Sequence, residues 1–525
     1  MGTASPNSPW PTGVAHLDQL LGGGLSHGAV TLIVGVPGSG KTTLASQLVF
    51  AQVKSGKRGL ILSALSESTS ALVAHLSTYQ FYQPELVGGP LQIQSLRQTL
   101  AGGLTAAKTE VVESVRRNRA DIVLIDGIHG LQSVATGIPE LRQFFYDVST
   151  TLATLGVTTL VTSEAHPHAQ EIFPEATTAD IVIGLHFGLH GVRQTRGLEI
   201  IKARGTPPLP GLHAMTISAT GIHLYPQLEE RITADLLGGD AQTQGAARTP
   251  EDPPDQPLPS LSDFTDSRAA FDLPPLDEIL GGGLPAATTT VLAGSIGVGK
   301  TLFATAFALA GVRAGEPVVF LSFRESRDQL LRAAAPFNVG PNLHDALASG
   351  AITHIAVPAI KINPDIIADR LLDTLDRTQA KRLVIDSIVE LEAAIQTSGA
   401  PERLREYFAA MLAALHQRGV TTLLTKETPK AVAATLDFSA EPLTVLAESV
   451  ILAQHITNHG RLHRLVSILK LRYGTHNPTV HEFQIVSPYG LQVIGPWDEY
   501  VENATPSAGE QSGTRKGKDP GAPHG

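Results

Sequence analysis

Short runs of apolar and β-branched residues recur along the chain, and each is followed by a longer stretch of helical periodicity. In the first half, the runs Ala29–Val34, Ile122–Asp126 and Gly156–Glu164 have this character, and residues 41–49 form one of the intervening helical stretches. Strands that are apolar on both faces are typical of parallel sheets covered by helices. The pattern therefore predicts an α/β fold in which a mostly parallel sheet is flanked by helices.

The same order of elements returns in the second half of the chain. The runs Thr289–Ala293, Leu383–Asp386 and Gly419–Glu427 repeat those of the first half, and a Leu-Gly-Gly-Gly-Leu segment precedes each copy, at 21–25 and 280–284. Order and spacing are both kept, which distinguishes a duplicated domain from a duplicated motif. The sequence thus predicts two copies of one α/β domain.

A glycine-rich loop follows the first predicted strand of each copy and leads into a predicted helix. The loops read GVPGSGKT (35–42) and GSIGVGKT (294–301). Glycines let the backbone wrap phosphate oxygens, the helix start directs N–H groups toward them, and the lysine reaches the β- and γ-phosphates. A chance glycine-rich turn is the alternative for either loop alone. The predicted nucleotide-binding residues are Gly35, Gly38, Ser39, Gly40, Lys41, Thr42 and Thr43, and in the second copy Gly294, Gly297, Val298, Gly299, Lys300, Thr301 and Leu302.

An aspartate ends a buried run downstream of each loop. The two aspartates are 260 residues apart and the two loop lysines 259, so few insertions separate these landmarks. A carboxylate at this place can hold the water shell of a Mg²⁺ ion that the loop threonine ligates. The alternative is an aspartate that only caps a strand end. The sequence predicts Mg²⁺-ATP as the ligand, with metal contacts from Thr42, Asp126, Thr301 and Asp386.

Composition shifts mark the ends of the two copies. Residues 238–268 are rich in Gly, Pro, Asp, Gln and Ser, and this segment is predicted to be a linker. Residues 1–10 and the polar tail 498–525 are predicted to be disordered. This leaves one predicted nucleotide-binding domain at 11–237 and a second at 269–497.

Composition excludes several classes of function. The 525 residues contain no cysteine, so disulfides, zinc–thiolate sites and thiol catalysis are ruled out. No apolar run approaches the roughly 18 residues of a membrane span and no export signal is visible, so we expect a cytoplasmic protein without a membrane partner. A net charge of −10 and 5% aromatic residues argue against nucleic acid as the main partner, although a basic stripe inside a ring would escape this argument.

The glycine segments, the phosphate loops, Asp-Gly or Asp-Ser after a strand, and a later Lys-x-Arg together resemble the KaiC-type ATPases of the RecA superfamily. The resemblance covers residues 11–496. It implies two tandem RecA-like P-loop NTPase domains and an ATP site at each subunit interface. It also implies a double-ring homo-hexamer that hydrolyses ATP slowly, with autophosphorylation and a regulatory protein partner as further expectations.

The resemblance assigns further catalytic roles to basic residues late in each copy. In such hexamers a basic pair from one subunit reaches the nucleotide of its neighbour, and the matching pairs are Lys202 with Arg204 and Lys470 with Arg472. A cation delivered in this way stabilises charge on the transferred phosphoryl group. Ordinary surface charges on a terminal strand are the alternative.

The chain departs from the family after the second strand of each copy. The family has two adjacent glutamates there, one of which polarises the attacking water. Here Ser66 and Arg324 take the first position, and only Glu67 and Glu325 remain as catalytic candidates. A strand alternates its faces, so the remaining glutamate would point away if extended geometry continued, whereas a loop could turn it back. We therefore expect ATP binding with slow hydrolysis at most.

The family's clock members carry two adjacent hydroxyl residues where this chain reads Thr444-Val445, so one phosphoacceptor is retained. The histidines form no predicted metal site. Those at 455, 459 and 463 recur every four residues, but the turn Asn458–Gly460 indicates a hairpin across which they do not converge. His166 and His168 are interpreted as loop residues.

Three functions from different classes fit these features. The first is a KaiC-type ATPase that couples nucleotide state to a regulatory partner, and it explains the duplication. The second is a RecA-like ATPase that acts on DNA, which should show salt-sensitive binding to single strands. The third is a nucleotide-bound scaffold with degenerate hydrolysis, which Ser66 and Arg324 favour.

Overall fold

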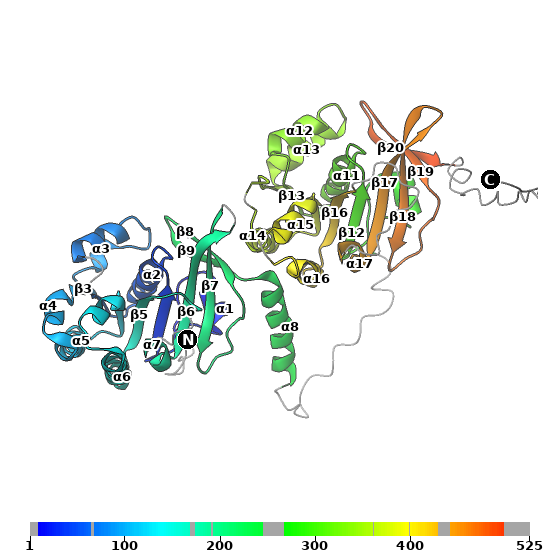
Figure 1. The fold of residues 1–525 in the computed structure, drawn as a ribbon. Coiled ribbons are helices and arrows are strands. Elements are labelled where there is room, and N and C mark those ends of the chain that lie inside the picture. Colours follow the sequence, from blue (N-terminus) through cyan, green and yellow to red (C-terminus); the bar gives the residue numbers. More distant parts are fainter. Residues whose placement is uncertain are drawn as a thin grey trace, which may run out of the picture. The chain divides into compact units, whose positions relative to one another are not determined.

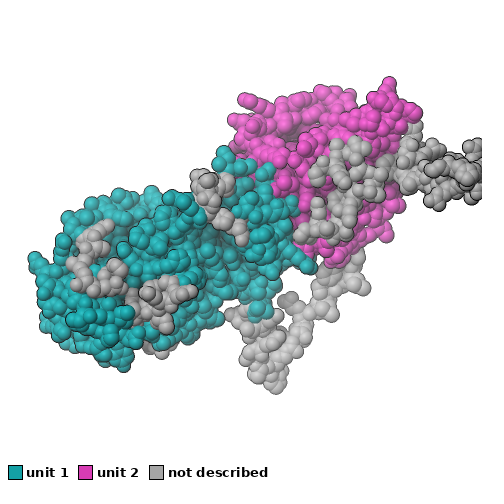
Figure 2. All heavy atoms as spheres, viewed as in Figure 1, with its two compact units in different colours: residues 1–257, 359–377, 390–417 teal, residues 258–358, 378–389, 418–525 magenta. Residues whose placement is uncertain are grey.

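The computed structural model describes residues 9–64, 68–168, 174–190, 193–244, 267–360, 362–397, 400–428 and 442–497. The chain divides into two compact units (Figure 2). The first comprises residues 1–257, 359–377 and 390–417, and the second comprises residues 258–358, 378–389 and 418–525. Each unit contains one nine-stranded sheet, and Figure 1 labels the elements of both.

The sheet of the first unit has the strand order β3-β2-β4-β5-β1-β6-β7-β8-β9. The six strands from β3 to β6 are parallel, and the last three pairings are antiparallel. The strands are β1 (Val30–Gly35), β2 (Gly59–Ser63), β3 (Leu91–Ser95), β4 (Ile122–Asp126), β5 (Thr158–Glu164), β6 (Ile181–His190), β7 (Arg193–Ala203), β8 (His213–Ser218) and β9 (Gly221–Tyr225). Strand β1 is thus central, between β5 and β6.

Residues of the central strands alternate between two hydrophobic cores. Ile33 of β1 belongs to the core that contains Leu44 of α2, whereas Val34 belongs to the core that contains Leu104 of α5. Because successive side chains of a strand point to opposite faces, helices cover both faces of this sheet. The helices are α1 (Leu17–Leu21), α2 (Lys41–Lys54), α3 (Thr69–Leu76), α4 (Arg97–Leu100), α5 (Gly103–Asn118), α6 (Ile138–Thr154), α7 (Pro174–Thr178) and α8 (Leu228–Gln244), with 3₁₀ turns η1 (Pro84–Leu86) and η2 (Ile128–Ser133).

The sheet of the second unit repeats this topology as β14-β13-β15-β16-β12-β17-β18-β19-β20. Its strands are β12 (Thr289–Gly294), β13 (Val318–Ser322), β14 (Ile352–Ala356), β15 (Arg382–Asp386), β16 (Thr421–Glu427), β17 (Ser449–Asn458), β18 (Arg461–Leu471), β19 (His481–Val486) and β20 (Gly490–Pro496). A separate short pair joins β10 (Arg268–Ala269) to β11 (Leu284–Pro285). The duplication therefore extends to the order of all nine strands.

One core of the second unit joins the sheet to the helix that follows the phosphate loop. Leu292 and Phe320 from the sheet pack in one cluster with Phe303 and Phe307 of α11. The helices in this half of the chain are α10 (Pro274–Ile279), α11 (Lys300–Arg313), α12 (Arg327–Ala334), α13 (Val339–Ser349), α14 (Pro364–Thr378), α15 (Val389–Gln396), α16 (Arg403–Gln417) and α17 (Pro442–Leu446).

The predicted α/β class is confirmed, with two mostly parallel sheets flanked by helices. Helix α8 continues to Gln244, past the start of the segment expected to be a linker, and residues 245–266 lie outside the described part of the chain. Of the segments expected to be disordered, 1–10 and 498–525, residues 1–8 and 498–525 also lie outside it. Trp10 is described, and its backbone exchanges hydrogen bonds with that of Leu25, so the predicted disorder is wrong at this residue. Among the helices that the structure describes, none is long and apolar enough to cross a membrane.

Candidate nucleotide sites

Each phosphate loop joins the central strand of its sheet to a helix that begins at the loop lysine. Helix α2 starts at Lys41 and α11 at Lys300. The residues just before these helices, Gly40 and Gly299, have φ angles of 103° and 113°. Residues that carry a side chain rarely adopt such positive φ angles, so glycine is required for the chain to turn from the loop into the helix. The predicted strand–loop–helix arrangement is present in both copies.

The two loop lysines are buried and fold back onto their own loops. Lys41 Nζ donates to the carbonyl oxygens of Gly35 at 2.9 Å and Val36 at 3.1 Å, and Lys300 Nζ makes the equivalent bonds to Gly294 and Ser295 at 3.0 and 2.9 Å. Burial lowers the pKa of both lysines, although nearby carboxylates act to raise it. The direct acceptors are neutral carbonyls, so an anionic ligand would be a stronger partner for each ammonium group.

In the first copy, the loop threonine and the aspartate of β4 lie side by side. Thr42 Oγ1 donates to Asp126 Oδ1 at 3.0 Å, and Asp126 is 4% exposed. Thr162 on β5 donates to the same Oδ1 at 2.7 Å and accepts a hydrogen bond from the backbone N–H of Gly127 at 2.8 Å. Thr162 therefore fixes the orientation of the carboxylate that faces Thr42.

The second copy has the same trio. Thr301 Oγ1 donates to Asp386 Oδ2 at 2.8 Å, and Thr425 on β16 donates to Asp386 Oδ1. The β5 and β16 threonines are absent from the sequence-based list of site residues. They are visible in the sequence only as members of the repeated strand segments Gly156–Glu164 and Gly419–Glu427. Their position in both copies is the signal that points to them.

The other predicted loop residues differ between the two copies. The Ser39 hydroxyl is buried and has no hydrogen-bond partner among the described residues, so it is a polar atom that a ligand could satisfy. At the matching position, Val298 packs into the core of its unit instead. Thr43 is 4% exposed, whereas its counterpart Leu302 lines the cavity at the second phosphate loop.

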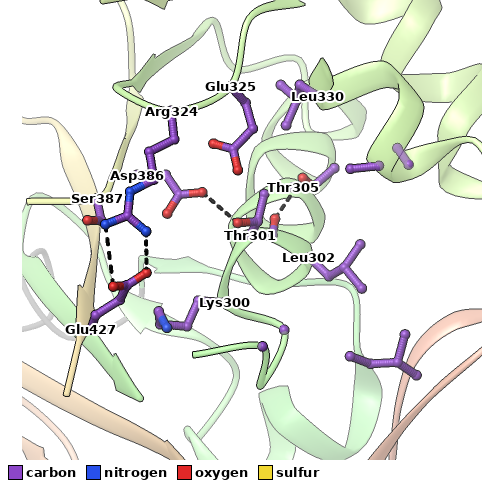
Figure 3. A pocket seen from close by; sticks show the side chains of 15 residues that line it. Lys300, Thr301, Leu302, Thr305, Arg324, Glu325, Leu330, Asp386, Ser387 and Glu427 are labelled. Carbon is purple, nitrogen blue, oxygen red and sulfur yellow. Dashed lines mark hydrogen bonds and ion pairs between the residues drawn. The ribbon is translucent and has the colours of Figure 1, made fainter. Parts of the chain in front are cut away.

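The second phosphate loop opens onto a cavity of about 340 Å³ (Figure 3). Its polar lining includes Lys300, Thr301, Arg324, Glu325, Asp386 and Glu427. Arg324 Nη1 lies 2.6 Å from Glu427 Oε1, at the end of β16. Because Glu427 pairs with Gly294 in the sheet register, this ion pair stands directly beside the phosphate loop.

The retained glutamate of the second copy lines this cavity. Strand β13 ends at Ser322, so extended geometry does not continue to Glu325, and Arg324 and Glu325 both line the cavity. Figure 3 shows the Glu325 carboxyl group directed into the space that Thr301 and Asp386 share. Burial raises the pKa of Glu325, and the nearby Asp386 carboxylate raises it further. In the first copy, Ser66 and Glu67 lie outside the described residues.

The Lys-x-Arg pairs lie at the opposite end of each sheet from the phosphate loops. In the first copy Ala203, between Lys202 and Arg204, pairs with Ile181 at the start of β6, whereas the loop begins at Gly35, the last residue of β1. Ile181 is level with Thr31, four residues before Gly35, and four residues of strand span roughly 13 Å. A lysine or arginine at 202 or 204 therefore does not meet the loop of its own domain, and the same holds for Lys470 and Arg472, since Lys470 pairs with Val450 near the start of β17.

The two members of each pair have different surroundings. Lys202 Nζ donates to the backbone oxygens of Ala176 at 3.2 Å and Ala179 at 2.6 Å, and Lys470 Nζ makes equivalent bonds at the end of α17. The side chain of Arg204 is 58% exposed and lies 3.5 Å from Asp180. The lysines thus brace their own domain, while Arg204 faces the surface.

The remaining sequence candidates are Thr444 and the histidines of the β17–β18 hairpin, of which His455 contacts the second phosphate loop. Thr444 on α17 is 4% exposed. His455 bonds to Ser295 at 3.0 Å and His463 to Glu482 at 2.8 Å, on either side of the β17–β18 turn. The prediction that the histidines of this hairpin do not converge is confirmed.

Comparison with known proteins identifies similar sequences that carry the name KaiC. The family model "ATPase: KaiC" matches residues 10–229 and 272–497. The chain is 30% identical over 490 residues to the circadian clock oscillator protein KaiC of Nostoc sp., covering 91% of this chain and 87% of the relative. It is 24% identical over 491 residues to the circadian clock protein KaiC3 of Synechocystis sp. (90% and 89% covered) and 23% identical over 488 residues to KaiC of Rippkaea orientalis (90% and 86%).

Proposed function

Because this chain belongs to the KaiC family of ATPases, we propose that it is an oligomeric regulatory switch that binds ATP at two sites and hydrolyses it slowly. The single observation that carries the proposal is the duplicated arrangement of loop lysine, loop threonine and strand-end aspartate. The family implies nucleotide binding and ATPase activity in general. We further propose that hydrolysis is slow, that Mg²⁺ accompanies the nucleotide and that the chains assemble into a hexamer. Its domain limits are 11–237 and 269–497, close to the two ranges that the family model matches.

The donor set at each loop fits a Mg²⁺ ion. A threonine hydroxyl and a carboxylate lie within hydrogen-bond distance of each other, and Mg²⁺ prefers hard oxygen ligands completed by water and phosphate oxygens. When bound, the ion would neutralise part of the phosphate charge. Thr42 and Thr301 would ligate it, while Asp126 and Asp386 would hold its water shell, each oriented by a threonine of the neighbouring strand.

The loop residues would hold the phosphates. The backbone N–H groups between Gly35 and Thr43, and between Gly294 and Leu302, would surround the phosphate oxygens, with the Lys41 and Lys300 ammonium groups exchanging carbonyl partners for phosphate. In the second domain, Glu325 would accept a proton from the attacking water, since its carboxyl group lines the cavity and burial raises its pKa above the ordinary value. Glu67 would do so in the first domain.

A hexameric ring explains why the Lys-x-Arg pairs lie far from the loops of their own domains. Arg204 and Arg472 would approach the nucleotide of a neighbouring subunit and stabilise charge on the phosphoryl group. The bonds of Lys202 and Lys470 to their own backbone support a positioning role for the lysines rather than direct contact. The ATP sites would then be complete only at subunit interfaces.

The names of the relatives support a regulatory rather than a metabolic role. They are circadian clock proteins, and we propose that this chain likewise signals its nucleotide state to a protein partner. Autophosphorylation at Thr444 is the least supported part of this reading, because its side chain is buried and phosphoryl transfer would require α17 to open.

One observation favours a second candidate, a nucleotide-bound scaffold with degenerate hydrolysis. The Arg324–Glu427 ion pair places a cation where the family has a glutamate, and it stands beside Lys300. In this reading the second domain would bind ATP without turning it over, and ATP would serve only to hold subunits together.

Nucleotide content tests the proposal. Purified protein should retain or bind two equivalents of ATP per chain, and Lys41→Ala and Lys300→Ala should each remove one. Lys57→Ala, at a lysine that stacks on Trp10 away from the loops, is the matched control. Binding that survives both loop substitutions would refute the assignment of the two sites.

A further inference from the structure

Three side chains with metal-binding groups converge in the first domain. His168 follows β5, His186 lies on β6 and Glu199 on β7. One ligand atom from each lies within 4.8 Å of the others. The Nε2 atoms of His168 and His186 lie 2.9 and 2.7 Å from the same oxygen, Glu199 Oε1. Among the residues that the structure describes, this is the one group of three such side chains close enough to share an ion.

The strand register explains why two of the three groups meet. Gly184 pairs with Glu199 across the β6–β7 hairpin, and alternation places His186 on the same face, two residues further along β6. A Cβ atom at Gly184 would lie 3.1 Å from the Glu199 carboxylate. Because residue 184 is a glycine, the Glu199 carboxylate has room to turn toward His186.

The cluster is specific to the first copy. In the second hairpin, Leu452 and Ser467 form the pair that matches Gly184 and Glu199, and Gln454 takes the place of His186. Neither the shared fold nor the shared phosphate loop therefore requires these residues. A separate role for the first copy explains why one hairpin carries two ligand groups and a glycine that makes room for them.

We propose that His168, His186 and Glu199 bind a divalent transition-metal ion, with Zn²⁺ the best fit. Two imidazoles and one carboxylate are a common set of three protein ligands for zinc, with the fourth position open to water or another ligand. Mg²⁺ and Ca²⁺ prefer sites made entirely of oxygen atoms. The set is therefore chemically distinct from the predicted Mg²⁺ position at Thr42 and Asp126.

Two of the three side chains are mostly buried and the third is exposed, so an ion could enter a site whose other ligands are held in place. The side chains of His186 and Glu199 are 22% and 17% exposed, so the strands hold them, whereas His168 is 63% exposed on its loop and leaves an entry path. Burial raises the pKa of Glu199, but the hydrogen bonds and charges of His186 and His168 outweigh it, and the pKa lies below its ordinary value.

Binding requires only a local change. Zinc–nitrogen and zinc–oxygen bonds are about 2.0–2.2 Å long, so two tetrahedral ligand atoms lie roughly 3.3 Å apart. The two Nε2 atoms, now 2.9 and 2.7 Å from Glu199 Oε1, would therefore move outward by a few tenths of an ångström to admit the ion, mainly through the exposed His168. Each imidazole would carry its proton on Nδ1 and present the Nε2 lone pair, in place of the present bond to Glu199. The hydrogen-bonded trio without any ion is the competing interpretation, and the experiment separates the two.

The test is metal binding by the untagged full-length protein. The protein is stripped with a chelator and dialysed against Zn²⁺ in the presence of excess Mg²⁺, which keeps Zn²⁺ from the phosphate loops, and bound zinc is measured by mass spectrometry. We expect one zinc per chain. Substituted Co²⁺ should give the visible absorption bands of a low-coordinate nitrogen–oxygen site. The absence of stoichiometric zinc would overturn the proposal.

Variants locate the ion. His186→Gln and Glu199→Ser install the residues of the second copy, and each should weaken zinc binding by more than about 100-fold, beyond the range typical of changes outside the ligand shell. His168→Ala should do the same on an exposed loop, where loss of folding is not expected, so it decides the matter if a strand variant unfolds. His344→Ala, at an exposed histidine beside Asp345, is the control. Zinc affinity unchanged in His168→Ala and His186→Gln would refute the site.

Discussion

Arg324 and Glu427 form an ion pair beside the second phosphate loop, with Nη1 of the arginine 2.6 Å from Oε1 of the glutamate. Arg324 stands at the position where the family resemblance leads us to expect a glutamate, and its charge acts to lower the pKa of Lys300. A cation at this place cannot accept a proton from water. It could instead bind phosphate oxygens, and we therefore propose that the arginine favours nucleotide binding over turnover.

Replacing Arg324 with glutamate should therefore raise turnover in the second domain. In a Lys41→Ala background, which silences the first site, we expect Arg324→Glu to increase phosphate release about tenfold, less than the 10²- to 10⁴-fold typical of an optimised general base. Arg327→Glu makes the same charge change on the exposed start of α12 and is the matched control. An equal effect in both variants would show that net charge, not the position, is responsible.

The pH dependence of phosphate release should report on Glu325. Burial and Asp386 raise its pKa above the ordinary value of 4.5. Only the ionised carboxylate accepts a proton, so turnover in the Lys41→Ala background should fall as the pH is lowered through this raised pKa. Glu325→Gln should reduce the rate and remove this part of the profile. A profile that keeps the same midpoint in Glu325→Gln would assign the titration to another group.

The threonines of β5 and β16 should tune metal affinity without touching the nucleotide. Thr162→Val and Thr425→Val remove the hydrogen bond to the aspartate at nearly constant volume, and we expect the Mg²⁺ requirement for ATP binding to rise about 10- to 100-fold. Thr159→Val and Thr422→Val, on the same strands, lose only local bonds to backbone oxygens and serve as controls. If the Thr162→Val and Thr425→Val variants gave the same Mg²⁺ titrations as these controls, the two threonines would not position the aspartates for the metal.

The exposed arginines should matter for turnover and not for affinity. Arg204→Ala and Arg472→Ala should lower phosphate release while leaving ATP binding at the same domain unchanged, because the loop contacts are intact. Mixing Arg204→Ala chains with Lys41→Ala chains should restore some activity, since the two defects would lie on different sides of an interface. Equal loss of binding and turnover in Arg204→Ala would contradict a role in trans.

The sequence was sufficient for the fold and for the loops because both are local and repeated. The glycines, the lysine and the threonine of each loop follow one another in the chain, and a buried run ending at Asp126 or Asp386 identifies its strand end directly. The duplication removed the ambiguity that a single match would leave. These are the features that elementary periodicity and spacing capture well.

The sequence was insufficient where residues meet across strands. Nothing in the order of residues shows that Thr162 turns toward Asp126, or that β13 stops early enough for Glu325 to line the cavity. His168 does lie in a loop, as interpreted, but its partners His186 and Glu199 come from later strands that the register alone brings together. Such contacts depend on sheet pairing and register, which local motifs and periodicity do not reveal.

The most direct test of the central claim measures mass and activity together. The protein is passed through size-exclusion chromatography with light scattering, with and without Mg²⁺-ATP, and released phosphate is assayed on the same fractions. The account predicts a hexamer in Mg²⁺-ATP that releases phosphate slowly, with both properties lost in the Lys41→Ala/Lys300→Ala double variant. A chain that stays monomeric in Mg²⁺-ATP would contradict the interface sites, and a hexamer that releases no phosphate would contradict the ATPase.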